Sequence, residues 1–138
     1  MKVAELTGPL LDYWTAKADG LVPLMEWYLT ATPRPACVWL RGPDGKPFLK
    51  AGVYSPSTDW KLGGEIINRE RISIGFHEFW GDGPSKPPTE LYARAYMWKP
   101  EWKKEIKFYG PDALINAMRC FVASKFGEEV PDYEPKEP

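Results

Sequence analysis

Residues 110–127, GPDALINAMRCFVASKFG, decide the fold, because they form a helix whose two ends are marked in the sequence. Pro111 suits a first helical turn, where it gives up no hydrogen bond, and Asp112 complements the positive end of the helix dipole. Lys125 in the last turn and Gly127 as a left-handed stop predict where the helix ends. We expect the rest of the chain to be organised around this helix.

The predicted helix has an apolar side and a polar side. Apolar residues recur at three- and four-residue spacing, which indicates a broad face packed on a sheet or another helix. These residues are Leu114, Ile115, Ala117, Met118, Phe121 and Val122. Asp112, Asn116 and Arg119 follow at i, i+4 and i+7 and should form one row on the opposite side. We expect Arg119 to bind backbone carbonyls or the acidic C-terminal tail in preference to a ligand.

A second helix is predicted near the N-terminus. Thr7 is suited to its N-cap and Pro9 to its first turn, and Gly20 marks its end. Between the two helices, runs rich in β-branched and aromatic residues predict strands. The predicted strands span 25–30, 36–41, 48–54, 71–79, 90–98 and 104–109. The first run also fits a helical turn, and we take the strand; a turn at 42–45 should join the second and third into a hairpin.

Residues 55–64 predict a single helical turn or a compact loop, pinned by Trp60 and ended by Gly63 and Gly64. Strands in succession between two terminal helices indicate an α+β domain over residues 1–130. Its sheet should be mostly antiparallel, with the N-terminal and C-terminal helices packed on one face. Residues 131–138, which are acidic and rich in proline, predict a flexible tail.

Three segments resemble the NinX-like phage proteins, a family of unknown function found in phages and prophages. The C-terminal helix followed by 128–131, EEVP, is similar to the end of that family. Residues 54–60, YSPSTDW, continuing through Gly63 and Gly64 to residue 70, look like its central motif, and residues 3–17 resemble its opening helix. The resemblance implies a phage or prophage origin inside a bacterial host, and it supplies no activity, cofactor or catalytic residue. Features specific to this chain should lie in 22–50 and 81–105, which are longer and richer in proline and tryptophan than expected.

The composition excludes several classes of protein. A net charge of −1 and a pI of about 5.9 lack the overall basic character of a nucleic-acid-binding protein, although a local patch remains open. No apolar run reaches the ~20 residues of a membrane span, and the N-terminus lacks the apolar region of a signal peptide. Cys37 and Cys120 are too few for a disulfide framework. We therefore expect a cytoplasmic protein that carries no cofactor.

The best candidate site is the segment 54–60, where hydroxyl and carboxylate groups stand beside two aromatic rings. Its candidate binding residues are Tyr54, Ser57, Thr58, Asp59 and Trp60. Functional groups concentrate on loops, but side chains of these types also pin loops by capping backbone groups. The structural role is the favoured alternative.

Ser57, Asp59 and His77, the single histidine, supply the residue types of an acyl-transfer triad. The chain has no GxSxG motif, and HEFWG at 77–81 is not the HExxH motif of zinc enzymes. A hydrolase is therefore the weaker alternative. The sequence predicts no catalytic residue and no metal site.

Residues 98–109, WKPEWKKEIKFY, interleave lysines with aromatic rings, which is the combination that single-stranded nucleic acids bind. Trp98, Trp102, Lys103 and Lys104 are the candidate contacts. The structural alternative is a solvated hairpin whose lysines discourage edge-to-edge pairing. A nucleic-acid-binding accessory protein is thus a second hypothesis.

The leading hypothesis is a non-catalytic binding protein that contacts a host or phage protein. Seven tryptophans are many for a core of this size, and Trp, Tyr and Arg are enriched at interface hot spots. Partial exposure is predicted for Trp27, Trp39, Trp80 and Trp102. A tryptophan-rich core is the alternative, and homodimerisation is plausible.

Overall fold

The computed structural model describes residues 1–42, 46, 53–80 and 88–132, with the backbone alone for 77–80 and 88–92. Three α-helices, two 3-10 helices and five strands follow one another in the described residues. They are η1 (Val3–Glu5), α1 (Gly8–Ala18), β1 (Pro23–Tyr28), β2 (Arg34–Leu40), α2 (Trp60–Glu70), β3 (Ser73–Trp80), β4 (Pro88–Lys99), η3 (Pro100–Trp102), β5 (Lys104–Gly110) and α3 (Ala113–Phe126).

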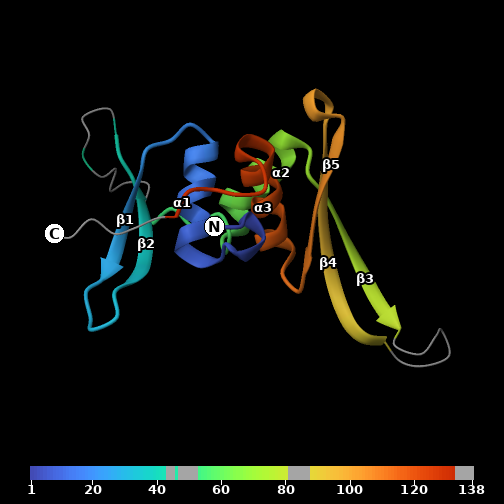
Figure 1. The fold of residues 1–138 in the computed structure, drawn as a ribbon, viewed down its shortest axis with the longest axis horizontal. Coiled ribbons are helices and arrows are strands. Elements are labelled where there is room, and N and C mark those ends of the chain that lie inside the picture. The colour runs from blue at the N-terminus through green and yellow to red at the C-terminus, as the bar shows by residue number, and fades with distance from the viewer. Residues whose placement is uncertain (43–45, 47–52, 81–87, 133–138) are drawn as a thin grey trace.

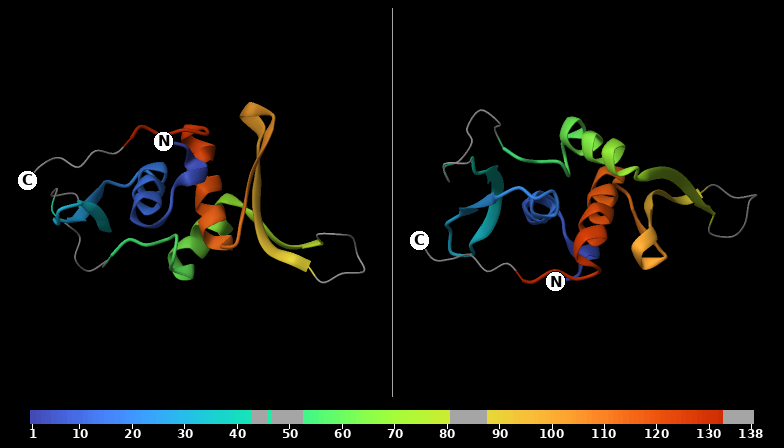
Figure 2. Two further views of the ribbon diagram at one scale, coloured as in Figure 1. Left: turned by 60° about the horizontal axis from the view of Figure 1, so that its bottom comes forward. Right: turned by 90° about the horizontal axis from the view of Figure 1, so that it is seen from above.

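The elements form three layers, with the helices in the middle (Figure 1). The antiparallel pair β1–β2 lies on one side, against α1, and the antiparallel sheet β3–β4–β5 lies on the other, against α3. The views in Figure 2 show the same order of layers. The predicted α+β class with antiparallel pairing is therefore confirmed, and the strands divide between two sheets that enclose the helices.

The helix α3 lies at the centre of this arrangement, as the sequence predicts. The carboxylate of Asp112 caps it by accepting a hydrogen bond of 3.0 Å from the N–H of Ile115, and Gly127 ends it at φ 88°. Pro111 precedes the cap, so the prediction that it lies in the first turn was wrong by two positions. Contacts with α1, α2 and all three strands of the larger sheet bury Met118 and Phe121 completely.

Asn116 corrects the predicted polar row on α3. Its side chain is buried, and its amide donates to the backbone oxygens of Ala93 and Gly110, at 3.2 and 3.3 Å. Neighbours surround α3 on more than one side, so the position opposite the apolar face is not left to solvent. The amide instead ties the helix to the middle of β4 and the end of β5.

The N-terminal part of the chain packs on the end of α3. The predicted first helix is confirmed as α1, although the Thr7 side chain makes no capping hydrogen bond. Ahead of it, Lys2 forms an antiparallel bridge with Glu129, and the N–H of Val3 donates to the carbonyl of Glu128 at 2.9 Å. The first and last described segments are thus joined by backbone hydrogen bonds.

The predicted strands at 25–30 and 36–41 are confirmed as β1 and β2, which pair with each other from Pro23 with Leu40 to Tyr28 with Arg34. The predicted turn at 42–45 and most of the predicted strand at 48–54 lie outside the described residues. Where the description resumes, the N–H of Tyr54 donates to Val38 of β2 at 2.7 Å. The strands predicted at 71–79, 90–98 and 104–109 are confirmed as β3, β4 and β5.

The helix α2 is the main departure from the prediction, which placed a single helical turn or a compact loop ended by Gly63 and Gly64. The helix starts after Asp59, whose carboxylate accepts from the N–H of Lys61 at 2.9 Å, and it runs on to Glu70. Gly63 lies inside the helix, where a Cβ atom would overlap the Pro56 carbonyl and the Leu114 side chain. This glycine permits close packing of α2 on α3, which the sequence pattern alone does not distinguish from a helix stop.

Candidate functional site

The segment 54–60 is held from within the fold by Asp12 of α1. The backbone N–H of Ser57 donates to Asp12 Oδ1 at 2.8 Å, and both side chains are buried. Trp60, the predicted pin of this loop, is instead 57% exposed. That part of the prediction was wrong, and Asp12 is a residue that the sequence reasoning missed. Its position on the buried side of α1, between Leu11 and Thr15, is the signal that could have revealed it.

The polar groups around Asp12 are under-satisfied. Burial raises the pKa of Asp12 to about 6, against the opposing effect of the hydrogen bond from Ser57. The Ser57 hydroxyl also favours the charged carboxylate, although it makes no hydrogen bond of normal geometry within the described residues. The Tyr54 hydroxyl also makes no hydrogen bond within the described residues. Its pKa is raised by burial and by the charges of Asp19 and Asp12.

The described geometry does not bring the triad residues together as a catalytic site. Ser57 is 1% exposed, and the carboxylate of Asp59 caps α2. His77 lies on β3, in the sheet on the far side of α3 from α1, and its side chain is outside the description. Thr58 donates through its hydroxyl to the Ser55 carbonyl at 3.4 Å, which is a local turn contact. The described geometry supports the structural role of this segment.

Arg119 makes the kind of contact that the sequence favours. Its Nε donates to the Leu6 carbonyl at 3.0 Å, so the side chain ties α3 to the segment before α1. Burial lowers the pKa of its guanidinium, with Asp112 acting in the opposite direction. The arrangement assigns Arg119 a structural contact.

The basic and aromatic segment 98–109 runs from the end of β4 through η3 into β5. Its four predicted contact residues lie on two different surfaces. Trp98 is 59% exposed at the end of β4, and Lys103 closes the turn in a left-handed conformation at φ 49°. Trp102 and Lys104 lie on the other side of the hairpin, where Lys104 forms an ion pair of 3.0 Å with Glu128. The four predicted contacts therefore do not form one site.

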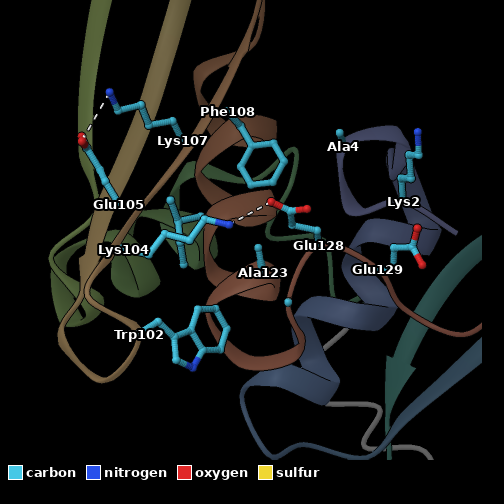
Figure 3. A pocket seen from close by; sticks show the side chains of 12 residues that line it. Lys2, Ala4, Trp102, Lys104, Glu105, Lys107, Phe108, Ala123, Glu128 and Glu129 are labelled. Atoms are coloured by element: carbon cyan, nitrogen blue, oxygen red, sulfur yellow. Dashed lines mark hydrogen bonds and ion pairs between the residues drawn. The ribbon is translucent and has the colours of Figure 1, made fainter.

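Trp102 and Lys104 line a hollow of about 660 Å³ between β5, the end of α3 and the N-terminal segment (Figure 3). Phe108 closes its wall, and the ion pair between Lys104 and Glu128 crosses it. The charges that face it are balanced, with Lys2 and Lys104 against Glu128 and Glu129, while Glu105 and Lys107 point away from it and pair with each other. The hollow shows no preference for a charged ligand, and the described residues hold no group of ligands for a metal ion.

The opposite side of the β3–β4–β5 sheet is a more distinctive surface, which we call the outer face. Ala93, Ala95 and Met97 of β4 are buried against the helices, so the alternate residues of that strand point outward. No described helix or strand covers this side (Figures 1 and 2). Among residues with described side chains, the face carries Ser73, Arg94, Tyr96, Trp98, Glu105, Lys107 and Tyr109.

The side chains of the outer face alternate between rings and cations. Across the strands, Arg94 pairs with Tyr109, and Tyr96 pairs with Lys107. The guanidinium of Arg94 lies over the Tyr96 ring, 4.7 Å from its centroid. Sequence reasoning named Trp98 as a candidate contact and missed Arg94 and Tyr96. The alternation of residues 93–98, ARAYMW, could have identified them.

Of the tryptophans expected to be partly exposed, Trp27 and Trp39 are half-buried and Trp102 is exposed. Trp39 donates from its indole nitrogen to Glu26 at 2.7 Å. Trp80 has no described side chain. Trp14 is buried beside Tyr13 and Phe126, so tryptophan serves both the core and the surface.

Comparison with known proteins gives one result. A family model described as "Bacteriophage P22, NinX" matches residues 2–125, which is most of the chain. No curated protein matches it. Within the described residues, no helix is both long enough and apolar enough to cross a bilayer.

Proposed function

The chain belongs to the bacteriophage P22 NinX family, and on that premise we propose that it is a phage- or prophage-encoded binding protein without catalytic activity. It acts in the cytoplasm of the bacterial host, as its phage origin suggests. The observation that carries the proposal is the outer face of the β3–β4–β5 sheet, which presents Arg94, Tyr96, Trp98, Lys107 and Tyr109 with no described element over it.

The positions of the candidate catalytic residues Ser57 and Asp59 favour binding over hydrolysis. Ser57 is 1% exposed, so its hydroxyl is shielded from a substrate, and the carboxylate of Asp59 caps α2. On the outer face, by contrast, Trp98 and Tyr109 are 59% and 51% exposed. Exposed rings beside an arginine are typical of surfaces that bind a macromolecule.

Two classes of partner can use this face. A host or phage protein, or a second copy of the chain, fits the enrichment of Trp, Tyr and Arg at protein interfaces. A nucleic acid fits the alternation of cations and rings. The two classes share the surface, so one experiment can test the surface before the partner is known.

That experiment places a photo-crosslinking phenylalanine derivative at Tyr109 and, as a matched control, at Trp60 on α2, which is similarly exposed. The proteins are irradiated in host cells during phage growth. We expect adducts from position 109 and few from position 60. Digestion with nuclease or protease then identifies the class of partner. Adducts that are absent at 109, or equal at the two positions, would refute the outer face as the binding surface.

A further inference from the structure

We infer that the ligand of the outer face is a single-stranded nucleic acid, bound by base stacking on Tyr96, Trp98 and Tyr109 and by phosphate contacts with Arg94 and Lys107. The inference rests on the proposed function, because it names the partner of the same surface. Four observations carry it: the spacing of the rings, the placement of the cations, the local charge and the composition of the face.

The three rings form an open row on a rigid support. Tyr96 and Trp98 are alternate residues of β4, which places them about 7 Å apart along the strand. Tyr109 lies on the neighbouring strand β5, in register with Arg94. Strand pairing fixes all three positions, so unstacked bases can meet the exposed rings of Trp98 and Tyr109 directly, and a base reaches Tyr96 once Arg94 turns from that ring to a phosphate.

The cations lie between the rings, where a phosphate backbone would run beside stacked bases. The guanidinium of Arg94 lies over Tyr96, 4.7 Å from the ring centroid, and Arg94 has no carboxylate partner among the described side chains. Lys107 is opposite Tyr96 and is paired with Glu105 at 3.3 Å. That pair is well exposed to solvent, so it holds Lys107 weakly and can be exchanged for a phosphate.

The charge of the hairpin differs in sign from that of the whole protein. Between Ala93 and Gly110 there are five basic residues and two acidic ones, in a chain of net charge −1. Of the basic residues, Arg94 and Lys107 lie on the outer face and Lys103 lies at the turn, whereas Lys99 and Lys104 lie on the other side of the hairpin. This local excess of positive charge complements a polyanion, and the acidic remainder of the chain disfavours binding elsewhere on the surface.

The composition of the face favours a nucleic acid over a protein. Its described side chains include no methionine, which is enriched at protein interfaces, and they include Ser73, Glu105 and Lys107, residue types that are depleted there. A duplex hides its bases within its own stack, so the exposed rings favour a single strand. Both DNA and RNA single strands carry this chemistry.

The test measures fluorescence anisotropy of labelled 20-nucleotide oligo-dT and oligo-U, with a 20-base-pair duplex for comparison, at several salt concentrations. We expect saturable binding of the single strands, weaker binding of the duplex, and a loss of about sevenfold in affinity between 50 and 200 mM salt if Arg94 and Lys107 contact two phosphates. Tyr109→Ala should weaken binding about tenfold or more, and Tyr109→Phe should retain most of it, because the ring remains.

Matched controls separate the outer face from general effects. Trp60→Ala removes an exposed ring, and Lys61→Glu reverses an exposed charge, both on α2. Each should change affinity less than twofold, whereas Lys107→Glu should reduce it about tenfold. Thermal melts of all the variants show whether each protein is folded.

The outcomes distinguish this inference from the proposed function. Absence of single-strand binding, or equal losses from Lys107→Glu and Lys61→Glu, overturns the inference. If position 109 then gives protease-sensitive, nuclease-resistant adducts in cells, the proposed binding function stands with a protein partner. If position 109 gives no adducts either, both are refuted.

Discussion

The carboxylate of Asp12 accepts a hydrogen bond of 2.8 Å from the backbone N–H of Ser57, and this contact joins the first helix to the turn that precedes α2. The two residues lie in the segments that resemble the opening helix and the central motif of the family. Their pairing gives a physical reason for the proximity of these segments, because a buried carboxylate without a hydrogen-bond donor would be costly.

Protonation of Asp12 should stabilise the protein in mildly acidic solution. Its pKa is raised from 3.8 to about 6 by burial, so the folded state binds a proton more tightly than the unfolded state. The free energy of unfolding should therefore fall as the pH rises from about 4 to above 6, by roughly 2 to 3 kcal/mol from this group. Urea denaturation across this range measures the effect.

Asp12→Asn is the matched variant, since it keeps an oxygen acceptor for Ser57 and removes the charge. At pH 7.5 it should be more stable than the natural protein, and the difference should shrink toward pH 4. A difference in stability that stays constant with pH would show that Asp12 is not the group responsible.

Gly63 and Gly64 offer a paired test of the packing between α2 and α3. Gly63→Ala should destabilise the protein by about 1 to 3 kcal/mol, because the new methyl group would overlap Pro56 and Leu114. Gly64→Ala should stabilise it by about 0.5 to 1 kcal/mol, since a Cβ there meets no atom within 4 Å. Thermal melts of both variants check the prediction; equal effects would contradict the observed helix packing.

The buried face of α3 can be tested at Met118. Met118→Asp introduces an unpaired charge at a position with 0% exposure, so we expect a loss of several kcal/mol and unfolding of the domain. Asn68→Asp, at an exposed position of α2, adds the same charge as a control and should shift stability by no more than about 0.5 kcal/mol. An unchanged melting temperature for Met118→Asp would contradict the assignment of the core.

Asn116→Ala should weaken the joint between α3 and the larger sheet. It removes the hydrogen bonds to the carbonyls of Ala93 and Gly110 and leaves a small cavity. We expect destabilisation of about 1 to 3 kcal/mol, and faster amide hydrogen exchange in β4 and β5 than in β1 and β2. Exchange that increases uniformly would mean that the side chain does not act locally.

The helices and strands themselves could be predicted better than the contacts between them. The caps and periodicity of α3 are local signals, and so is the alternation of β4, which is why the types of these elements and most of the core of α3 follow from the sequence. The pairing of β1 with β2, and the position of helices between two sheets, depend on contacts between distant segments. Periodicity does not specify such contacts.

The candidate site shows the same division. Asp59 could be identified as a residue that satisfies backbone groups, because a cap acts on its near neighbours. The role of Asp12 could not be assigned, since its partner Ser57 is on another element. Trp98 and Lys104 are close in sequence but lie on different sides of the hairpin. Trp98 of β4 pairs with Glu105 of β5, so Lys104, the residue before Glu105, points to the opposite side. The sequence does not specify this pairing, because it leaves the bounds of both strands uncertain.

The bridge between Lys2 and Glu129, with the hydrogen bond from Val3 to Glu128, has a consequence for biosynthesis. Residues 2 and 3 are synthesised long before residues 128 and 129, which supply their backbone partners. Their docking must therefore wait until residues 128 and 129 have left the ribosome, however early α1 forms its own turns. Until then, the backbone groups of the segment before α1 lack these partners, and α1 cannot be joined to the end of α3.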